Sequence, residues 1–506
     1  MPRLPRRLIV ILLLALVAGC GGPSGPEESP AERAGAPAPR PVERPAARRP
    51  NIIFVFADQL RASSVGYAGQ EPVKTPRLDR FAAQGAVFTT AVSPLPVCTP
   101  YRASLLTGRT ALSTGVVLND VPLKTTETTI AHACKAGGYD TAYIGKWHLN
   151  GPDRRSPVPA GPPRQGFDHW EAANFDHNYD HSVYFEGESP EPRVWEGFDA
   201  ESQTTAAIEY LRDHGREKPV CLFLSWGPPH HPYRTVPRRY LDLYDPATIK
   251  GRPNCPEPPL ADLHGYYAQI SFLDEQLGRL LDAIDELGMA DDSIVVFTSD
   301  HGDMHGSHGV YKKQWPWDES ILVPLVVRYP RAVEAGARFG FPVSVIDLMP
   351  TLLGLAGLPI PKPVEGVNLA PFIRGERSDP PPAVLLANPC PFSVGDPRGP
   401  DQVPTYEGRR MEYRGVRTAR HTYVRTIDGP WLLYDNEADP YQRDNLIDDP
   451  AHAATRVELE ATMRALMART GDEFLPKETY YERFGLKVDE RGKLQGIIDN
   501  PYDRGG

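Results

Sequence analysis

Charged and metal-binding side chains follow four segments that have the pattern of buried strands. Each segment is an apolar run rich in β-branched or aromatic residues, as expected of strands covered on both faces of a parallel sheet. In open α/β sheets ligands bind beyond the carboxyl ends of the strands, so side chains at four such ends predict one shared site. The residues are, in chain order, Asp58, Lys146, His230 with His231, and Asp300 with His301.

Helical segments alternate with these strands. Thr75 and Pro76 have the pattern of a helix start and Gly85 of a helix end. We expect strands at 51–57, 141–144, 220–226 and 293–299, and helices at 75–85, 128–136, 200–214 and 266–286. This alternation predicts an α/β fold with a large, mostly parallel sheet flanked by helices on both faces.

The composition changes after about residue 380. A proline-rich stretch runs to Pro404 and is followed by short alternating segments such as 415–425 and 431–434, then by a helical pattern near 457–469. We therefore expect a catalytic α/β domain over 50–380 and a smaller C-terminal α+β subdomain over 381–506, with an antiparallel sheet and a helix.

Composition and charge exclude several classes of protein. The chain has 506 residues, of which 55 are proline, 44 are glycine and 41% are hydrophobic. This content argues against collagen, coiled coil and intrinsic disorder. The net charge is −10, without a basic tract in the folded part, so nucleic acid is not an expected partner.

The N-terminus has the pattern of an export signal. Arg3, Arg6 and Arg7 precede the apolar run 8–19. At about 1.5 Å per residue this run is too short to cross a hydrocarbon core of roughly 30 Å. Val17-Ala18-Gly19-Cys20 resembles the bacterial lipobox. We expect a lipoprotein signal over 1–20, lipidation of Cys20 and a Pro/Ala-rich tether over 21–49. The protein would then be an exported lipoprotein in the periplasm or at the cell surface, and it would contact the membrane only through its anchor. An ordinary cleaved signal is the alternative.

Export permits disulfide bonds. With Cys20 and Cys98 assigned to other roles, four cysteines remain, which allow three pairings that the sequence does not distinguish: Cys134, Cys221, Cys255 and Cys390. The chain has no Cys-x-x-Cys pair, which argues against a structural zinc site.

Two motifs carry a resemblance to a known family. Cys98-Thr99-Pro100-Tyr101-Arg102, continued through Arg109, resembles the type I sulfatase signature, and the run from Gly138 to His148 resembles the second signature of that family. The resemblance extends through 229–232, 299–303, 434–435 and 439–440, and covers nearly everything from Asn51 onward.

The resemblance implies a sulfuric ester hydrolase of the alkaline phosphatase-like superfamily. A formylglycine-generating enzyme would convert Cys98 to formylglycine, whose hydrate has two hydroxyl groups. One attacks sulfur, and loss of the proton of the other expels sulfate and regenerates the aldehyde. Negative charge builds up during hydrolysis, so a metal and two lysines would supply positive charge. Aryl or carbohydrate sulfates, on a small molecule or a glycan, are the expected substrates.

The family also implies roles for individual residues of this chain. The implied metal ligands are Asp58, Gln59, residue 98, Asp300 and His301, and this oxygen-dominated set suits Ca²⁺ best and Mg²⁺ next. Arg102 would hold the formylglycine, Lys146 and His148 would contact the nucleophile and the sulfate, and His230 would donate a proton to the leaving group.

The second lysine is Lys312 or Lys313, and the spacing to Asp318-Glu319 in the family favours Lys313. Several other residues have more than one interpretation. His231 could be a loop residue beside proline or could contact the substrate, and His305 and His308 could be surface residues, could support the site from behind or could act in catalysis. Trp315 and Trp317 could stack on a sugar ring or pack in the core, and 174–195 could form a substrate loop.

The metal segments depart from the commonest family pattern. Many sulfatases have two consecutive aspartates in the first segment and Asp-Asn in the last, whereas this chain has Asp58-Gln59 and Asp300-His301. Similar variants occur among formylglycine-dependent phosphonate monoester and phosphodiester hydrolases, which are the alternative function. A binding protein on a decayed sulfatase fold is less well supported, because Cys98, Arg102 and Lys146 are all retained.

Overall fold

The computed structural model describes residues 49–214, 217–394, 402–403 and 405–498. The predicted leader with Cys20 and all but the last residue of the predicted tether lie outside these residues. In the described part of the chain, no helix is both long and apolar enough to cross a membrane.

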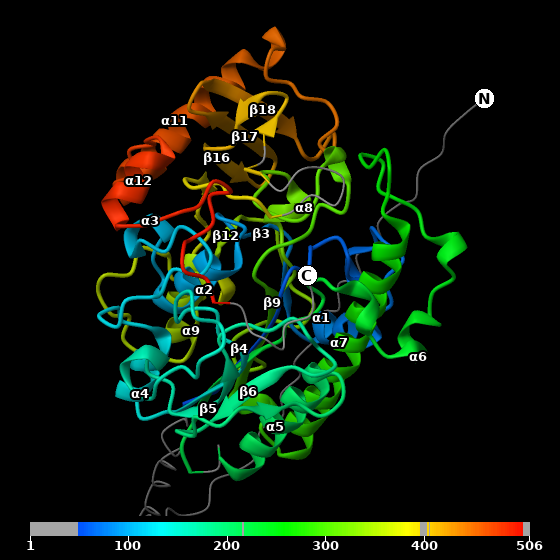
Figure 1. Cartoon of the computed structure of the whole chain (residues 1–506), viewed down its shortest axis with the longest axis vertical. Helices are drawn as coiled ribbons and strands as arrows, with labels where there is room; N and C mark the ends of the chain where they lie inside the picture. Colours follow the sequence, from blue (N-terminus) through cyan, green and yellow to red (C-terminus); the bar gives the residue numbers. More distant parts are fainter. Residues whose placement is uncertain (1–48, 215–216, 395–401, 404, 499–506) are drawn as a thin grey trace, which may run out of the picture. The chain divides into compact units, whose positions relative to one another are not determined.

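A ten-stranded mixed sheet forms the centre of the fold (Figure 1). The central strands run parallel, and their continuous apolar sequences are buried, as predicted. Antiparallel strands join on either side of them. The order is β11 (Arg338–Phe339), β2 (Ala86–Phe88), β10 (Leu325–Arg328), β9 (Ser293–Ser299), β1 (Asn51–Ala57), β8 (Val220–Ser225), β4 (Asp140–Lys146), β5 (His169–Ala173), β6 (Val183–Glu186) and β7 (Arg193–Val194).

Helices cover both faces of this sheet, which confirms the predicted α/β class (Figure 1). One core cluster joins α1 (Pro76–Gln84), α5 (Asp199–Asp213) and α7 (Leu260–Glu286) to Ile53 and Val55 of β1. A second cluster joins α2 (Cys98–Thr107), α4 (Ile130–Ala136) and α9 (Val345–Leu355) to Ile52 and Phe54. Neighbouring residues of β1 point to opposite faces, so one strand anchors both helical layers.

The C-terminal part contains the predicted small antiparallel sheet and helix. Four strands pair in the order β13 (Ala383–Asn388), β16 (Tyr413–Thr418), β17 (His421–Thr426) and β18 (Gly429–Asp435). Helix α11 (Ala453–Thr470) packs on this sheet through Leu459 and Met463, and α12 (Lys477–Phe484) follows it. The domain boundary near residue 380 remains a prediction.

The structure answers two questions that the sequence leaves open: whether four of the cysteines form disulfides, and whether Trp315 and Trp317 pack in the core. Cys134, Cys221, Cys255 and Cys390 are free thiols, so none of the three disulfide pairings is formed. Trp315 and Trp317 are buried in a core cluster with residues of the C-terminal sheet, so the interpretation as a sugar-stacking surface is wrong and the packing interpretation is right.

Candidate active site

The four strand ends meet at one site, as the sequence predicts. Asp58 follows β1, Asp300 and His301 follow β9, and Lys146 is the last residue of β4. The Lys146 ammonium lies 2.7 Å from a carboxylate oxygen of Asp58, and Gln59 donates its backbone N–H to Asp300 (3.0 Å). Hydrogen bonds therefore connect the ends of three parallel strands.

Cys98 reaches this edge of the sheet from the first residue of α2. Its Sγ lies 2.9 Å from the Lys313 ammonium, 3.2 Å from His301 Nε2 and 3.6 Å from Asp58 Oδ1. Burial and the charge of Asp58 oppose ionisation, but Lys313, Lys146 and His301 outweigh them and hold the pKa of the thiol well below its usual value. The surroundings of residue 98 therefore stabilise negative charge.

Arg102 lies one helical turn after Cys98, on the same face of α2. Its guanidinium donates to Asp58 (3.1 Å) and Asp300 (3.3 Å), and also to the Lys146 carbonyl and the Ser225 hydroxyl. The side chain is buried, so these contacts fix the two carboxylates relative to each other.

The two carboxylates differ in acidity although they share Arg102. Burial opposes ionisation of Asp58, yet Lys146, Arg102 and Lys313 hold the pKa of that carboxyl well below its usual range. Burial and the charge of Asp58 raise the pKa of Asp300 to about 6. Two carboxylates this close favour a bound cation, because each raises the cost of ionising the other.

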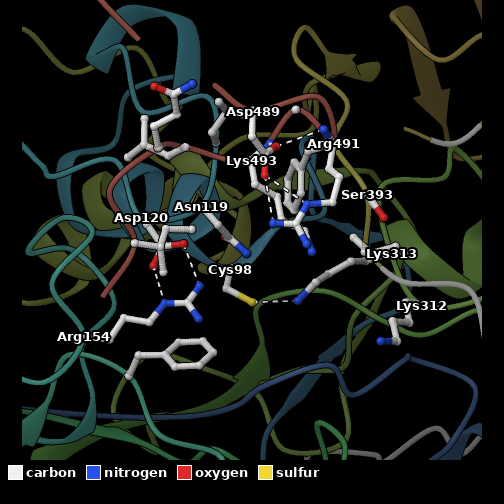
Figure 2. Close-up of a pocket in the computed structure, with 18 of the residues that line it drawn as sticks. Cys98, Asn119, Asp120, Arg154, Lys312, Lys313, Ser393, Asp489, Arg491 and Lys493 are labelled. Atoms are coloured by element: carbon white, nitrogen blue, oxygen red, sulfur yellow. Dashed lines mark hydrogen bonds and ion pairs between the residues drawn. The ribbon is translucent and has the colours of Figure 1, made fainter. Parts of the chain in front are cut away.

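The structure distinguishes the two adjacent lysines. Lys313 is 5% exposed and contacts Cys98, His301 and His230. Lys312 is half-buried and lies farther from Cys98 (Figure 2). This geometry supports the choice of Lys313.

Three histidines gather beside the lysines. His230 Nε2 lies 3.4 Å from Lys313 Nζ, and His177 Nε2 lies 3.2 Å from Lys146 Nζ. The two imidazoles stack with ring centroids 4.0 Å apart. Burial, reinforced by neighbouring charges, holds the pKa of both well below the usual value. His231 also lines the pocket, whereas His305 and His308 pack against Tyr266 and Trp317.

Cys98, Lys313 and the three histidines His177, His230 and His231 line a pocket of about 890 Å³ (Figure 2). Sequence reasoning places His177 only within a substrate loop and misses Asn119, Asp120 and Arg154 of the pocket wall, together with Arg491 and Lys493 near the C-terminus. No local motif marks these residues, because segments far apart in the chain bring them together. Of the predicted loop 174–195, Phe175 and His177 line the pocket.

The ligand atoms of four side chains could hold a metal ion, since they all lie within 4.8 Å of one another: Asp58, Cys98, Asp300 and His301. The Gln59 side-chain oxygen is buried and finds no hydrogen-bond donor among the described residues. His301 Nδ1 lies 2.9 Å from the Gly302 carbonyl, which can only accept a hydrogen bond. In the neutral imidazole the proton is therefore on Nδ1, and Nε2 offers its lone pair to the cluster. The residues present therefore fit a divalent cation.

Comparison with known proteins agrees with this geometry. Residues 50–358 match the family model described as Sulfatase. The chain is 39% identical over 444 residues to an ulvan-active sulfatase of Formosa agariphila, covering 86% of this chain and 84% of the relative. It is 30% identical over 471 residues to an endo-4-O-sulfatase of Bacteroides thetaiotaomicron, covering 81% and 90%.

A solved structure shares the fold. It is BT33494S-sulf, from a Bacteroides thetaiotaomicron locus for the metabolism of multiple glycosaminoglycans, with a TM-score of 0.76, 27% identity, and coverage of 86% of this chain and 99% of that one. The chain thus belongs to the sulfatase family of the alkaline phosphatase-like fold and is a sulfuric ester hydrolase.

Proposed function

We propose that this enzyme cleaves sulfate monoesters of a carbohydrate, with residue 98, converted from cysteine to formylglycine, as the nucleophile. The observation that carries the proposal is the position of Cys98, which lies 2.9 Å from the Lys313 ammonium and lines a pocket of about 890 Å³. A pocket of this size suits a saccharide rather than a sulfate group alone. The names of the two sulfatase relatives, which include ulvan and endo-4-O action, support a carbohydrate ester.

The oxygen-rich donor set supports a calcium or magnesium ion, with calcium favoured. Asp58, Gln59, Asp300 and His301 would hold it together with residue 98. When bound, the ion lowers the pKa of the nucleophilic hydroxyl and offsets the charge of the sulfate.

Lys146 and Lys313 stabilise the transition state. Each ammonium lies among buried acceptors, Lys146 at Asp58 and Lys313 at Cys98, so neither must reorganise as charge develops on the sulfuryl oxygens. Arg102 positions the carboxylates through its bonds to Asp58 and Asp300. His148 Nε2 lies 3.2 Å from Asp120, and its buried Nδ1 has no partner among the described residues. The resemblance to the second sulfatase signature assigns His148 a contact to the nucleophile or the sulfate.

His230 protonates the leaving oxygen. Its Nδ1 lies 2.9 Å from the His231 carbonyl, which can only accept, so Nε2 faces Lys313 and the pocket. His230 takes up a proton at Nε2 from solvent and passes it to the departing sugar oxygen, while Nδ1 keeps its proton at the His231 carbonyl and Lys313 stays charged. The low pKa of His230 makes the protonated imidazole a strong acid for this step.

Sulfatase and phosphonate hydrolase activities are distinguished by a paired assay. We expect kcat/KM for 4-nitrophenyl sulfate to exceed that for the matched 4-nitrophenyl phosphonate monoester, and a sulfated oligosaccharide to be a better substrate than either. A preference for the phosphonate would instead support the formylglycine-dependent phosphonate hydrolase alternative.

The proposal also covers how the enzyme matures and where it is located. A formylglycine-generating enzyme would recognise Cys98, Pro100 and Arg102. After export, the protein would be anchored to the membrane through lipid on Cys20. Membrane-fraction labelling with a radioactive fatty acid should depend on Cys20 and disappear in Cys20→Ala. Labelling that persists in this variant would contradict the lipid anchor at Cys20.

A further inference from the structure

The C-terminal segment 488–498 forms a hairpin that lines the pocket. Val488 and Leu494 pair as an antiparallel bridge, and Asp489 donates its backbone N–H to the Lys493 carbonyl (2.8 Å). Gly492 at the turn has a φ of 74°, in the left-handed region that favours glycine. The turn directs Arg491 and Lys493 to the pocket, as Figure 2 shows.

Backbone hydrogen bonds hold this hairpin in place. Ser393 donates to the Arg491 carbonyl (2.8 Å), Arg154 donates to the Ile498 carbonyl (3.0 Å), and Ile498 donates to the Pro152 carbonyl (2.9 Å). Backbone hydrogen bonds thus join the hairpin to two segments that are distant in the chain, 152–154 and Ser393. Since main-chain atoms make these contacts, a change of the Arg491 or Lys493 side chain leaves them intact.

Among the described residues, the pocket wall carries more cationic than anionic side chains, although the whole chain is acidic. These residues include two carboxylates, Asp120 and Asp489, and five cationic side chains, Arg154, Lys312, Lys313, Arg491 and Lys493. Such an excess inside a cleft concentrates anionic ligands. Lys313 contacts Cys98, whereas Arg491 and Lys493 come from the hairpin.

Ion pairs with the two carboxylates orient the two arginines. Asp489 accepts from Arg491 at 2.9 Å and Asp120 accepts from Arg154 at 2.7 Å. In Figure 2 the Arg491 guanidinium extends into the pocket above Cys98. Asn119 adds a neutral donor from the same side, because its side-chain oxygen accepts from the Thr99 backbone N–H (3.1 Å) and its NH₂ group points inward.

We propose that Arg491 and Lys493, supported by Arg154, form a second anion subsite that binds a carboxylate or a second sulfate group of the substrate. The enzyme would then select sulfated saccharides that carry at least one further negative charge near the ester that is cleaved. This inference rests on the proposed function, because the cleaved ester defines the first anion position beside Cys98.

The test uses the full-length enzyme and three disaccharides as competitive inhibitors of 4-nitrophenyl sulfate hydrolysis. One disaccharide is neutral apart from a single sulfate, one carries a sulfate and a uronate, and one carries two sulfates. We expect wild-type enzyme to bind at least one of the dianionic sugars about tenfold or more tighter than the monosulfated sugar, the scale of a charge-assisted contact. The preferred dianion identifies the second group.

The variant R491A/K493A should reduce this ratio of inhibition constants to about one. Lys487→Ala is the matched control: it removes an exposed lysine directly before the hairpin that is not among the residues lining the pocket, and it should retain the wild-type ratio. Sodium chloride at about 0.5 M should also reduce the ratio in the wild-type enzyme, because screening weakens exposed charges; this arm needs no variant to fold.

Failures of the two proposals are distinguishable. Wild-type enzyme with formylglycine at position 98 that does not cleave 4-nitrophenyl sulfate would contradict the proposed function. Cleavage without a preference for a dianionic sugar, or a preference that survives in R491A/K493A, would overturn the second anion subsite alone.

Discussion

The buried charges around Glu71 and those of the active site are arranged differently. The first, here called the Glu71 cluster, consists of Arg61, Glu71, Arg252 and Glu319. Glu71 accepts from Arg61 (2.7 Å) and Arg252 (3.1 Å), and Arg252 also donates to Glu319 (2.9 Å). Two cations thus meet two carboxylates, and Ser63, Ser64 and Tyr267 hydroxyls donate to Glu71 as well.

The second, here called the active-site cluster, has unequal numbers of charges. The cations Arg102, Lys146 and Lys313 meet the carboxylates Asp58 and Asp300. Burial opposes ionisation of Glu71, but its two arginines hold the pKa of that carboxyl below the usual range, whereas the pKa of Asp300 is raised to about 6. The Glu71 cluster pairs equal numbers of its own charges, while the active-site cluster has one more cation than carboxylates, which suits an anionic substrate.

The largest effect should follow from removing residue 98. Cys98→Ala is expected to lower kcat by a factor on the order of 10⁴ or more, because the nucleophile and one metal ligand are lost together. Cys98→Ser can form a sulfated enzyme but lacks the second hydroxyl needed to release sulfate, so intact-mass analysis should show a stable adduct. Multiple turnovers by the serine variant would contradict the elimination step.

Metal removal should come next. Chelation is expected to lower turnover on the order of 10³-fold, since several kcal/mol of charge stabilisation are lost, and calcium or magnesium should restore it. The melting temperature should also fall, because Asp58 and Asp300 are then left facing each other. Full activity in a preparation shown by elemental analysis to be metal-free would refute the metal site.

The two active-site lysines should have smaller effects. Lys146→Ala and Lys313→Ala are each expected to lower kcat/KM by about 10²–10³-fold, the usual cost of removing one preorganised donor. Lys312→Ala should cost much less, because Lys312 lies away from Cys98. If it lowers kcat/KM more than Lys313→Ala does, the lysine assignment is off by one residue.

The Glu71 cluster should show the opposite behaviour. Glu71→Gln leaves Arg61 without its buried counter-charge and leaves Arg252 with Glu319 alone, so denaturant titration should show a loss of about 3–5 kcal/mol in the free energy of unfolding. The kcat/KM of the folded variant should change little. Asp282→Asn, at the half-exposed pair with Arg77, is the control and should cost at most about 1 kcal/mol. Equal losses of unfolding free energy in Glu71→Gln and Asp282→Asn would contradict the claim that the Glu71 cluster stabilises the fold.

The sequence predicts the parts of the site that depend on local pattern. Strands β1, β8 and β9 are continuous apolar runs, so their ends could be located and Asp58 and Asp300 assigned to one edge. Cys98 and Arg102 belong to a contiguous motif, and their spacing of four residues already places both on one face of a helix.

What the sequence does not predict depends on contacts between distant segments. His177 lies in an irregular loop, and only the folded chain brings it to Lys146 and His230. Arg491 reaches the pocket because the C-terminal hairpin bonds to 152–154 and to Ser393. Trp317 has a composition compatible with sugar binding, and only its packing against Trp431 and Tyr406 shows that it is a core residue.

The most direct test of the central claim is mass spectrometry of the peptide that contains Cys98, on enzyme preparations of different specific activity. If residue 98 is the formylglycine nucleophile, the peptide shows exchange of H₂S for one oxygen atom, and the converted fraction rises in proportion to sulfatase activity. Fully active enzyme with an unmodified Cys98 thiol would contradict the account.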